Sequence, residues 1–256
     1  MPMSDVERET YLLHSRLASY RRKVERAQQA IREGLKMMEN PYVALSWGKD
    51  SEVTTHLAIA ERPHVRVMFI NGGCGYPETY ALRDRLVPEW DLNYIEINSQ
   101  TEHWADYLRR RGLGVDLDPA KGTRIAKTSW AVKFARANEH DGVIMGLRAE
   151  ESGRRKIALL RGGVLYRVKA DRLWHCCPLA WWSVRDVWAY IVEHDLPYNG
   201  LYDHCDAVFP RESLRGGAWT STLGANYNGR LVWLRKYYPD LWARFAAEFP
   251  EIRQYS

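Results

Sequence analysis

The sequence predicts an α/β fold: a mainly parallel, doubly wound sheet with helices on both faces. Short apolar runs of strand length alternate with helical segments, and three of these runs end in loops rich in glycine or charged residues. Strands joined by such helices pair in parallel with a right-handed crossover, and ligands bind beyond their carboxyl ends. The expected strands are 42–45, 65–70, 92–97 and 142–145.

We expect three parts along the 256 residues: a long N-terminal helix (1–40), a central α/β domain (41–203), and a C-terminal loop and helical extension packed on that domain (204–256). A chain of this length can bury a sizeable core. Hydrophobic residues make up 46% of it and charged residues 27%, which is typical of a soluble globular protein.

Cysteine content and hydropathy favour a cytoplasmic protein. Four cysteines in a chain of this size do not make a disulfide framework, so reduced thiols are expected. No apolar run approaches the roughly 18 residues of a membrane span, and the N-terminus is charged, so neither a signal peptide nor a membrane partner is expected. The net charge of +5 is compatible with a nucleotide or DNA without choosing between them.

Residues 4–39 predict one long amphipathic helix, because apolar side chains recur at three- and four-residue spacing from Leu13 to Met38. Arginine and lysine line its other face. A solvated face is the favoured interpretation, with a nucleic-acid contact as the alternative. The dipeptide Asn40-Pro41 ends the helix.

The loop after the first strand has the composition of a phosphate-binding loop. It precedes a helical pattern over 52–61, so it lies at a helix N-terminus, where unpaired N–H groups attract phosphate. Gly48 permits close backbone approach, Lys49 supplies positive charge, and two serines supply hydroxyl donors. The alternative is a solvated turn. The loop consists of Ser46, Trp47, Gly48, Lys49, Asp50 and Ser51.

Two further loops follow strands. After 65–70, the run Asn71-Gly72-Gly73 lets backbone or ligand come close, and Pro77-Glu78-Thr79 opens a helix with proline and an acid in its first turn. After 142–145, Arg148 and Arg155 are suited to hold phosphate, sulfate or a developing pyrophosphate. The alternative for these arginines is an exposed, internally salt-bridged turn, but strand-end loops at one sheet edge favour a site.

The remaining elements are predicted from local patterns. Helices are expected at 102–111, at 128–138 and after a capping box of Ser183 and Asp186, and a hairpin strand at 164–168. A loop at 112–122 and a second at 211–222 are candidates to cover the site. From Gly229 onward a helical aromatic tail is broken at Pro239.

The first loop, Ser-x-Gly-Lys-Asp-Ser, resembles the PP-loop of the ATP pyrophosphatase superfamily, with Trp47 in place of a glycine. The second loop is similar to the Asp-Thr-Gly and Pro-Glu-Thr pattern of the phosphoadenosine phosphosulfate (PAPS) reductase family, with Asn71 replacing the aspartate. The third matches that family's Gly-x-Arg-x-x-Glu-Ser-x-x-Arg. The resemblance covers residues 42–203 and implies an adenine nucleotide alpha hydrolase-like fold with ATP and Mg²⁺ as ligands.

The resemblance also implies residue roles. Loop N–H groups and Lys49 would stabilise a departing pyrophosphate. Asp50 would either position Mg²⁺ or only cap its helix. The candidate catalytic residues are Lys49, Asp50, Arg148 and Arg155; the candidate nucleotide-binding residues are Ser46, Trp47, Gly48, Lys49, Asp50, Ser51, Phe69, Ile70, Asn71, Gly72, Gly73, Gly146, Glu151 and Ser152.

Cysteine placement counts against the family's best-known reaction. Its reductases use a nucleophilic cysteine in a C-terminal Glu-Cys-Gly-Leu-His segment, whereas no cysteine follows Cys205 here. The thiolate is the attacking species, so reduction is disfavoured. An iron–sulfur cluster is not expected, because Cys176 and Cys177 lack the second pair that four-thiolate ligation needs, and they are interpreted as small hydrophobic residues. Cys74, in the glycine loop, is the candidate reactive thiol.

The predicted reaction is therefore cleavage of ATP to pyrophosphate and AMP or an adenylate, in support of sulfur incorporation such as DNA phosphorothioation. An adenine nucleotide and other protein subunits, namely a sulfur donor or DNA-acting proteins, are the expected partners, and direct contact with DNA stays open. One alternative is a PAPS reductase that takes its thiol from a partner. A second is a non-catalytic nucleotide-binding subunit of a larger complex.

Overall fold

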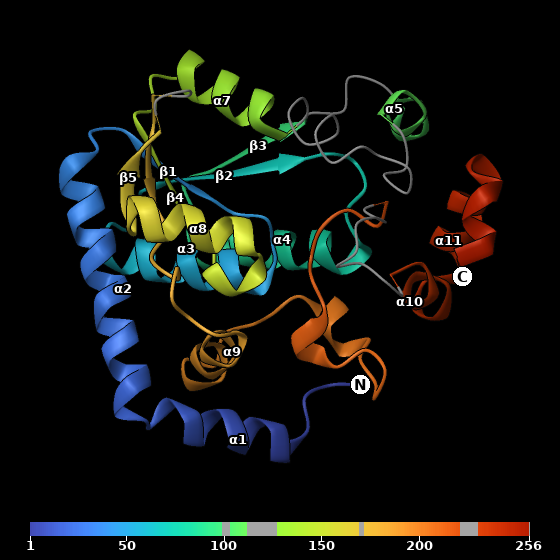
Figure 1. Ribbon diagram of the computed structural model, residues 1–256, viewed down its shortest axis with the longest axis horizontal. Helices are drawn as coiled ribbons and strands as arrows, with labels where there is room; N and C mark the ends of the chain where they lie inside the picture. The colour runs from blue at the N-terminus through green and yellow to red at the C-terminus, as the bar shows by residue number, and fades with distance from the viewer. Residues whose placement is uncertain (99–102, 112–126, 169–171, 221–229, 256) are drawn as a thin grey trace.

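The computed structural model describes residues 1–98, 103–111, 127–168, 172–220 and 230–255. Its strands are β1 (Pro41–Ala44), β2 (Arg66–Asn71), β3 (Tyr94–Asn98), β4 (Gly142–Met145), β5 (Leu165–Arg167) and β6 (Trp174–Cys176). They form one sheet in the order β3-β2-β1-β4-β6-β5 (Figure 1). Every pairing of described strands is parallel except that of β5 with β6. The predicted mainly parallel α/β fold is confirmed.

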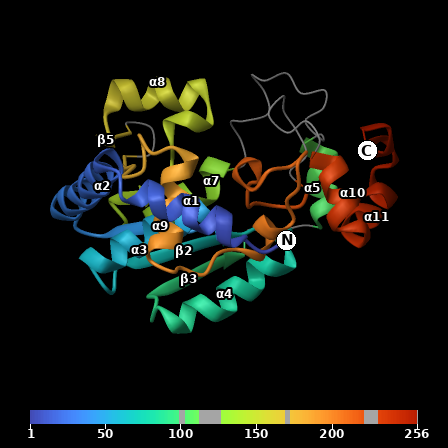
Figure 2. The same cartoon turned by 90° about the horizontal axis from the view of Figure 1, so that it is seen from below.

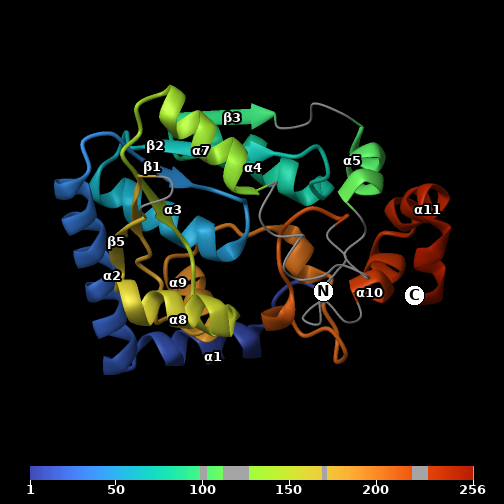
Figure 3. The same cartoon turned by 45° about the horizontal axis from the view of Figure 1, so that its top comes forward.

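Helices cover both faces of this sheet. Figure 1 shows α7 above the strands and α3 and α4 below them, and Figure 3 brings α7 to the front. The helices are α1 (Asp5–Ser15), α2 (Ala18–Met37), α3 (Lys49–Glu61), α4 (Pro77–Glu89), α5 (Trp104–Arg111), α7 (Lys127–Ala137), α8 (Gly153–Gly162), α9 (Val184–Glu193), α10 (Arg230–Tyr237) and α11 (Pro239–Glu248).

The alternation of side chains along β1 explains the two layers. Tyr42 faces a small cluster that includes Ala135 of α7, whereas Val43 faces the main core together with Val53 and Leu57 of α3. Successive strand residues point to opposite faces, so a strand apolar on both faces is covered on both. The buried sheet holds the loops at its carboxyl edge in place.

The prediction of one N-terminal helix over 4–39 is wrong. α1 ends with its C-cap at Arg16, and α2 begins after Leu17, which has extended backbone (φ −67°, ψ 133°). α1 packs along α9, with Tyr11 beside Trp188, whereas α2 lies against the sheet, where Cys176 Sγ donates to Ala30 O at 3.4 Å. The two contacts lie in different directions, so the chain turns between them (Figure 1).

The hairpin predicted around 164–168 is present as β5 and β6, although β6 itself was not predicted. The loop predicted at 112–122, and the last residues of that at 211–222, lie outside the described residues. The helical tail broken at Pro239 is confirmed, since this proline opens α11. In the described part of the chain, none of the helices has the length and apolarity needed to cross a membrane.

The C-terminal helices extend the domain on one side. Figure 2 shows α10 and α11 beside α5. Trp104 of α5 contacts Phe245 and Phe249 edge-on or tilted, and Tyr76, just before α4, contacts Trp233 and Tyr238. Aromatic pairs in these geometries add to the free energy gained by burial. Core packing thus accounts for most aromatic residues of the tail.

Candidate functional site

The PP-loop, defined as Ser46–Ser51, links β1 to α3, and its serines hold it in shape. Ser51 Oγ donates to Gly48 O at 2.9 Å and accepts the N–H of Ser46 at 3.0 Å. Since a hydroxyl carries one hydrogen, Ser46 Oγ is the donor in the 3.0 Å bond between the two hydroxyls. Gly48 is the N-cap of α3 without a side-chain cap, so α3 presents its N-terminal N–H groups to the loop.

Trp47 adopts a backbone conformation that ordinarily favours glycine, with φ 58°. Its side chain is fully buried, with ring contacts to Phe69 and Tyr94. Its carbonyl accepts a hydrogen bond from Asn199 Nδ2 at 2.9 Å. Burial of the indole and this bond stabilise the left-handed conformation, so the loop keeps its shape without the glycine.

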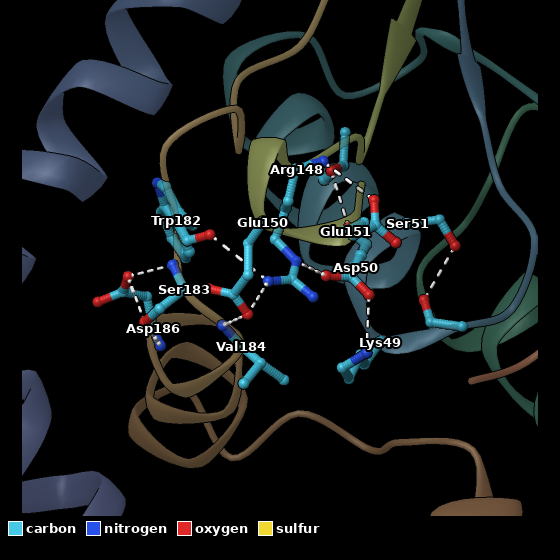
Figure 4. A network of polar contacts seen from close by, with 12 residues as sticks. Lys49, Asp50, Ser51, Arg148, Glu150, Glu151, Trp182, Ser183, Val184 and Asp186 are labelled. Atoms are coloured by element: carbon cyan, nitrogen blue, oxygen red, sulfur yellow. Dashed lines mark hydrogen bonds and ion pairs between the residues drawn. The ribbon is translucent and has the colours of Figure 1, made fainter. Parts of the chain in front are cut away.

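Lys49 and Asp50 of the PP-loop form a polar network with Arg148 (Figure 4). Lys49 Nζ lies 2.9 Å from one oxygen of Asp50, and Arg148 Nε donates to the other at 2.5 Å. Arg148 also donates to Glu150 at 3.0 Å. Lys49 and Arg148 are buried, 2% and 4% exposed. Three predicted catalytic residues thus lie together, with Glu150 as an unpredicted fourth member.

The pairing fixes the charges in this network. Burial raises the pKa of the Asp50 carboxyl, but Lys49 and Arg148 outweigh burial and hold the pKa below its ordinary value. Burial lowers the pKa of Lys49, yet Tyr202 and Asp50 reverse the shift and raise it. Asp50 is therefore an anion and Lys49 a cation at neutral pH. The site therefore contains two buried positive groups, both paired with the Asp50 carboxylate.

Gly146 allows β4 and α3 to meet at this point. A Cβ atom added there would lie 2.5 Å from the carbonyl oxygen of Asp50, closer than real contacts permit. The glycine therefore has a packing role, which brings Arg148, two residues later, within reach of Asp50.

Arg155 and the predicted binding residues Glu151 and Ser152 form the outer part of the site. Arg155 is hydrogen-bonded to Glu151, whose Oε2 also accepts the N–H of Arg148 at 3.1 Å. Ser152 caps α8 by accepting the N–H of Arg155 at 3.2 Å. Ser152 thus holds the helix start, and Glu151 links Arg155 to the buried network.

Asn71, which stands where the pattern of the PAPS reductase family has an aspartate, lies against the carboxylate of Glu96. Asn71 Nδ2 donates to Glu96 Oε1 at 2.7 Å, while Asn71 Oδ1 accepts from Gly73 N at 2.8 Å. An aspartate would place a second carboxylate against Glu96, whereas the amide bonds it. Of the other predicted binding residues, Phe69 is buried, Ile70 half-buried, and Gly72 and Gly73 exposed.

Two residues that the sequence analysis did not single out hold the PP-loop in place. Tyr202 Oη accepts the N–H groups of Lys49 at 3.1 Å and Gly216 at 3.2 Å. Asn199 Nδ2 donates to Thr79 Oγ1 at 3.0 Å as well as to Trp47 O, joining the PP-loop to α4. Their only sequence signal is the stretch Leu196 to Asp203, whose polar residues lie among packing residues.

The cysteines are placed as packing residues rather than as exposed nucleophiles. Cys74, Cys176 and Cys177 are buried, and Cys205 is half-buried. Burial raises the pKa of the Cys74 thiol, against smaller lowering effects of Thr220 and Arg244, and raises that of Cys177 to about 12. A raised pKa disfavours the thiolate. The geometry therefore counts against Cys74 as a reactive thiol in this conformation.

The residues present do not fit a direct protein-bound Mg²⁺. Both oxygens of Asp50, the predicted ligand, are engaged by Lys49 and Arg148, so neither is free for a metal ion. Among the described residues, no group of three or more His, Cys, Asp or Glu side chains could hold a metal. The second role considered for Asp50, as a helix cap, is also not observed; it is an ion-pair partner.

Comparison with known proteins agrees with this geometry. Residues 40–224 match the family model described as the phosphoadenosine phosphosulfate reductase domain. The chain belongs to this family. One relative, the phosphoadenosine 5′-phosphosulfate reductase of Xanthomonas axonopodis pv. citri, is 33% identical over 174 residues, covering 64% of this chain and 67% of the relative. That of Xanthomonas oryzae pv. oryzae (strain PXO99A) is 30% identical over 188 residues, covering 70% and 71%.

Solved structures of two enzymes, a PAPS reductase and an FMN adenylyltransferase, share the fold of this chain. The PAPS reductase of Candida auris, as a phosphate complex, superposes with a TM-score of 0.54 at 18% identity, covering 87% of this chain and 99% of that one. The FMN adenylyltransferase of Candida glabrata, with FAD and inorganic pyrophosphate, gives 0.57 at 13% identity, covering 86% and 72%. At these identities the likeness concerns the fold alone.

Proposed function

We propose that this chain binds an adenine nucleotide by its phosphates at the PP-loop and acts on a sulfonucleotide, with phosphoadenylyl sulfate as the first candidate. The observation that carries the proposal is the buried Lys49–Asp50–Arg148 network at the N-terminus of α3. It lies within the segment that matches the reductase family. The names of the curated relatives support the same substrate.

The network suits a reaction in which a nucleotide phosphate leaves as an anion. The ammonium of Lys49 and the PP-loop N–H groups other than those of Ser46 and Lys49, which donate to Ser51 and Tyr202, would stabilise negative charge without reorganisation, since they are already held in place. In sulfonucleotide reduction, a thiolate attacks the sulfur, the bond from sulfur to the nucleotide oxygen breaks, and the nucleotide departs. A second thiol then releases sulfite as a disulfide forms. Arg148 and Lys49 would act on the departing nucleotide.

The buried cysteines favour a thiol supplied by a partner protein. They also favour a second candidate function, in which the same site cleaves ATP between its α- and β-phosphates to yield AMP or an adenylate. That reaction needs no thiolate of this chain, and Cys74, Cys176 and Cys177 all have raised thiol pKa values. Within this second candidate, sulfur incorporation into DNA is the proposed setting, with a sulfur donor and DNA-acting proteins as partners.

Product analysis separates the two candidates. The purified chain is incubated with phosphoadenylyl sulfate plus thioredoxin and its reducing system, and separately with ATP. We expect sulfite and adenosine 3′,5′-bisphosphate from the first mixture, lost in Lys49→Ala but kept in Lys156→Ala, a lysine on the exposed surface of α8. AMP and pyrophosphate from the second mixture, without sulfite from the first, would move the assignment to ATP cleavage. No turnover of either nucleotide would refute both.

A further inference from the structure

Arg215 lies on a segment that folds back onto the PP-loop. A Cβ atom added to the next residue, Gly216, would lie 3.2 Å from Gly48 Cα, so the two backbones are in contact. Tyr202 ties them together, because its hydroxyl accepts the N–H groups of both Gly216 and Lys49. The side chain of Arg215 therefore starts beside the loop that is proposed to hold the nucleotide phosphate.

The guanidinium of Arg215 reaches the carboxylate that Arg155 also binds. Arg215 Nη1 lies 3.6 Å from Glu151 Oε1, whereas Oε2 accepts from Arg155 and from the N–H of Arg148. A separation of 3.6 Å is an ion pair without a hydrogen bond. Both arginine side chains are partly open to solvent, 40% exposed for Arg155 and 42% for Arg215.

Positive charge exceeds negative charge at this outer position. The buried cations Lys49 and Arg148 are matched by Asp50, whose side chain is 18% exposed, and by Glu150, whose side chain is 46% exposed. Beside them, and counting only the residues that the structure describes, the guanidinium groups of Arg155 and Arg215 share one carboxylate, that of Glu151. Guanidinium groups match phosphate and sulfate oxygens with paired N–H donors. The outer part therefore has both the charge and the donors to hold a second anionic group.

We propose that Arg215 and Arg155 form a second anion subsite, which binds a second phosphate or sulfate of the nucleotide whose first phosphate lies on the PP-loop. This inference rests on the proposed function. The second group is either an ester on the ribose or the far end of the 5′ chain, because both carry the same oxyanion chemistry. Arg215 lies in the loop at 211–222 that was expected to cover the site, although the residue itself was not singled out from the sequence.

Calorimetric titrations with three nucleotides test the subsite. AMP, adenosine 3′,5′-bisphosphate and ADP are titrated into the wild type, Arg215→Gln and the control Arg154→Gln, a neighbouring exposed arginine on α8. In the wild type, we expect the second phosphate to tighten binding at least about tenfold over AMP for one of the two nucleotides. We expect Arg215→Gln to remove most of this gain and to bind AMP with an affinity within about twofold of the wild type. We expect Arg154→Gln to keep the gain.

The pattern of loss identifies the second group. If Arg215→Gln loses the gain in affinity of adenosine 3′,5′-bisphosphate over AMP, the ribose ester binds at the subsite. If the variant loses the gain of ADP over AMP, the end of the 5′ chain binds there. The subsite is refuted if Arg215→Gln weakens all three nucleotides equally or leaves the gain intact. If AMP binds but neither second phosphate tightens binding, the subsite alone fails. If no nucleotide binds the wild type, the proposed function fails and the subsite fails with it.

Discussion

Trp47 is the residue at which this chain departs most from the usual PP-loop. Its φ of 58° is one that a glycine adopts freely and a tryptophan does not. The full burial of the indole against Phe69 and Tyr94 offsets that cost. The loop motif was evident from the sequence, but the backbone conformation at Trp47 was not, because it depends on ring contacts with β2 and β3.

This conformation predicts an unusual order of stabilities for two substitutions. Trp47→Ala is expected to lower the free energy of unfolding by about 3–5 kcal/mol, because a buried aromatic ring is lost. Trp47→Gly is expected to cost about 1 kcal/mol less than Trp47→Ala, since glycine relieves the left-handed strain. Urea unfolding of the three proteins measures both values. A glycine variant less stable than the alanine variant would contradict a strained Trp47.

At the scale of elements, Asp186 joins three helices at a single carboxylate. Its oxygens lie 2.8 Å from His14 Nε2 of α1 and 2.6 Å from Lys23 Nζ of α2, and it accepts the N–H of Ser183 in the capping box of α9. The capping box was predicted from sequence. The bonds of Asp186 to α1 and α2 were not predicted, because they join residues more than 160 positions apart.

These contacts predict acid sensitivity. Burial raises the pKa of Asp186, but His14, Lys23 and Ser183 together lower it below the ordinary value. A carboxyl with a lowered folded-state pKa adds stability above its unfolded pKa of about 4, and loses it as the pH falls through the folded value. Asp186→Asn is therefore expected to destabilise the protein by about 1–3 kcal/mol at pH 7. The difference from wild type should shrink below about pH 4.

Thermal unfolding across this pH range, with Asp195→Asn as the control, checks the expectation. Asp195 pairs with Arg8 at 2.6 Å, but its side chain is 83% exposed, so its loss is expected to change stability by less than about 1 kcal/mol. A deficit of Asp186→Asn that stayed constant from pH 7 to pH 3 would show that ionisation of this carboxyl does not stabilise the helix junction.

At the scale of the whole molecule, local patterns predicted five of the six strands that the structure describes, the three loops and their common edge of the sheet. They did not predict how segments distant in sequence complete the site. Tyr202 and Asn199 bond the PP-loop from more than 150 residues away, and Gly216 packs directly on it. Such contacts leave no periodic trace in the sequence, since each depends on one side chain or one missing Cβ atom.

The most direct measurement is calorimetric titration of adenine nucleotides, ATP and adenosine 3′,5′-bisphosphate, into the wild type, Lys49→Ala and the surface control Lys156→Ala. The central claim is that the PP-loop and Lys49 hold a nucleotide phosphate. We predict that Lys49→Ala weakens binding at least about tenfold, because a charge-assisted contact is lost, and that Lys156→Ala binds as the wild type does. Equal affinities of Lys49→Ala and wild type for both nucleotides would contradict the account.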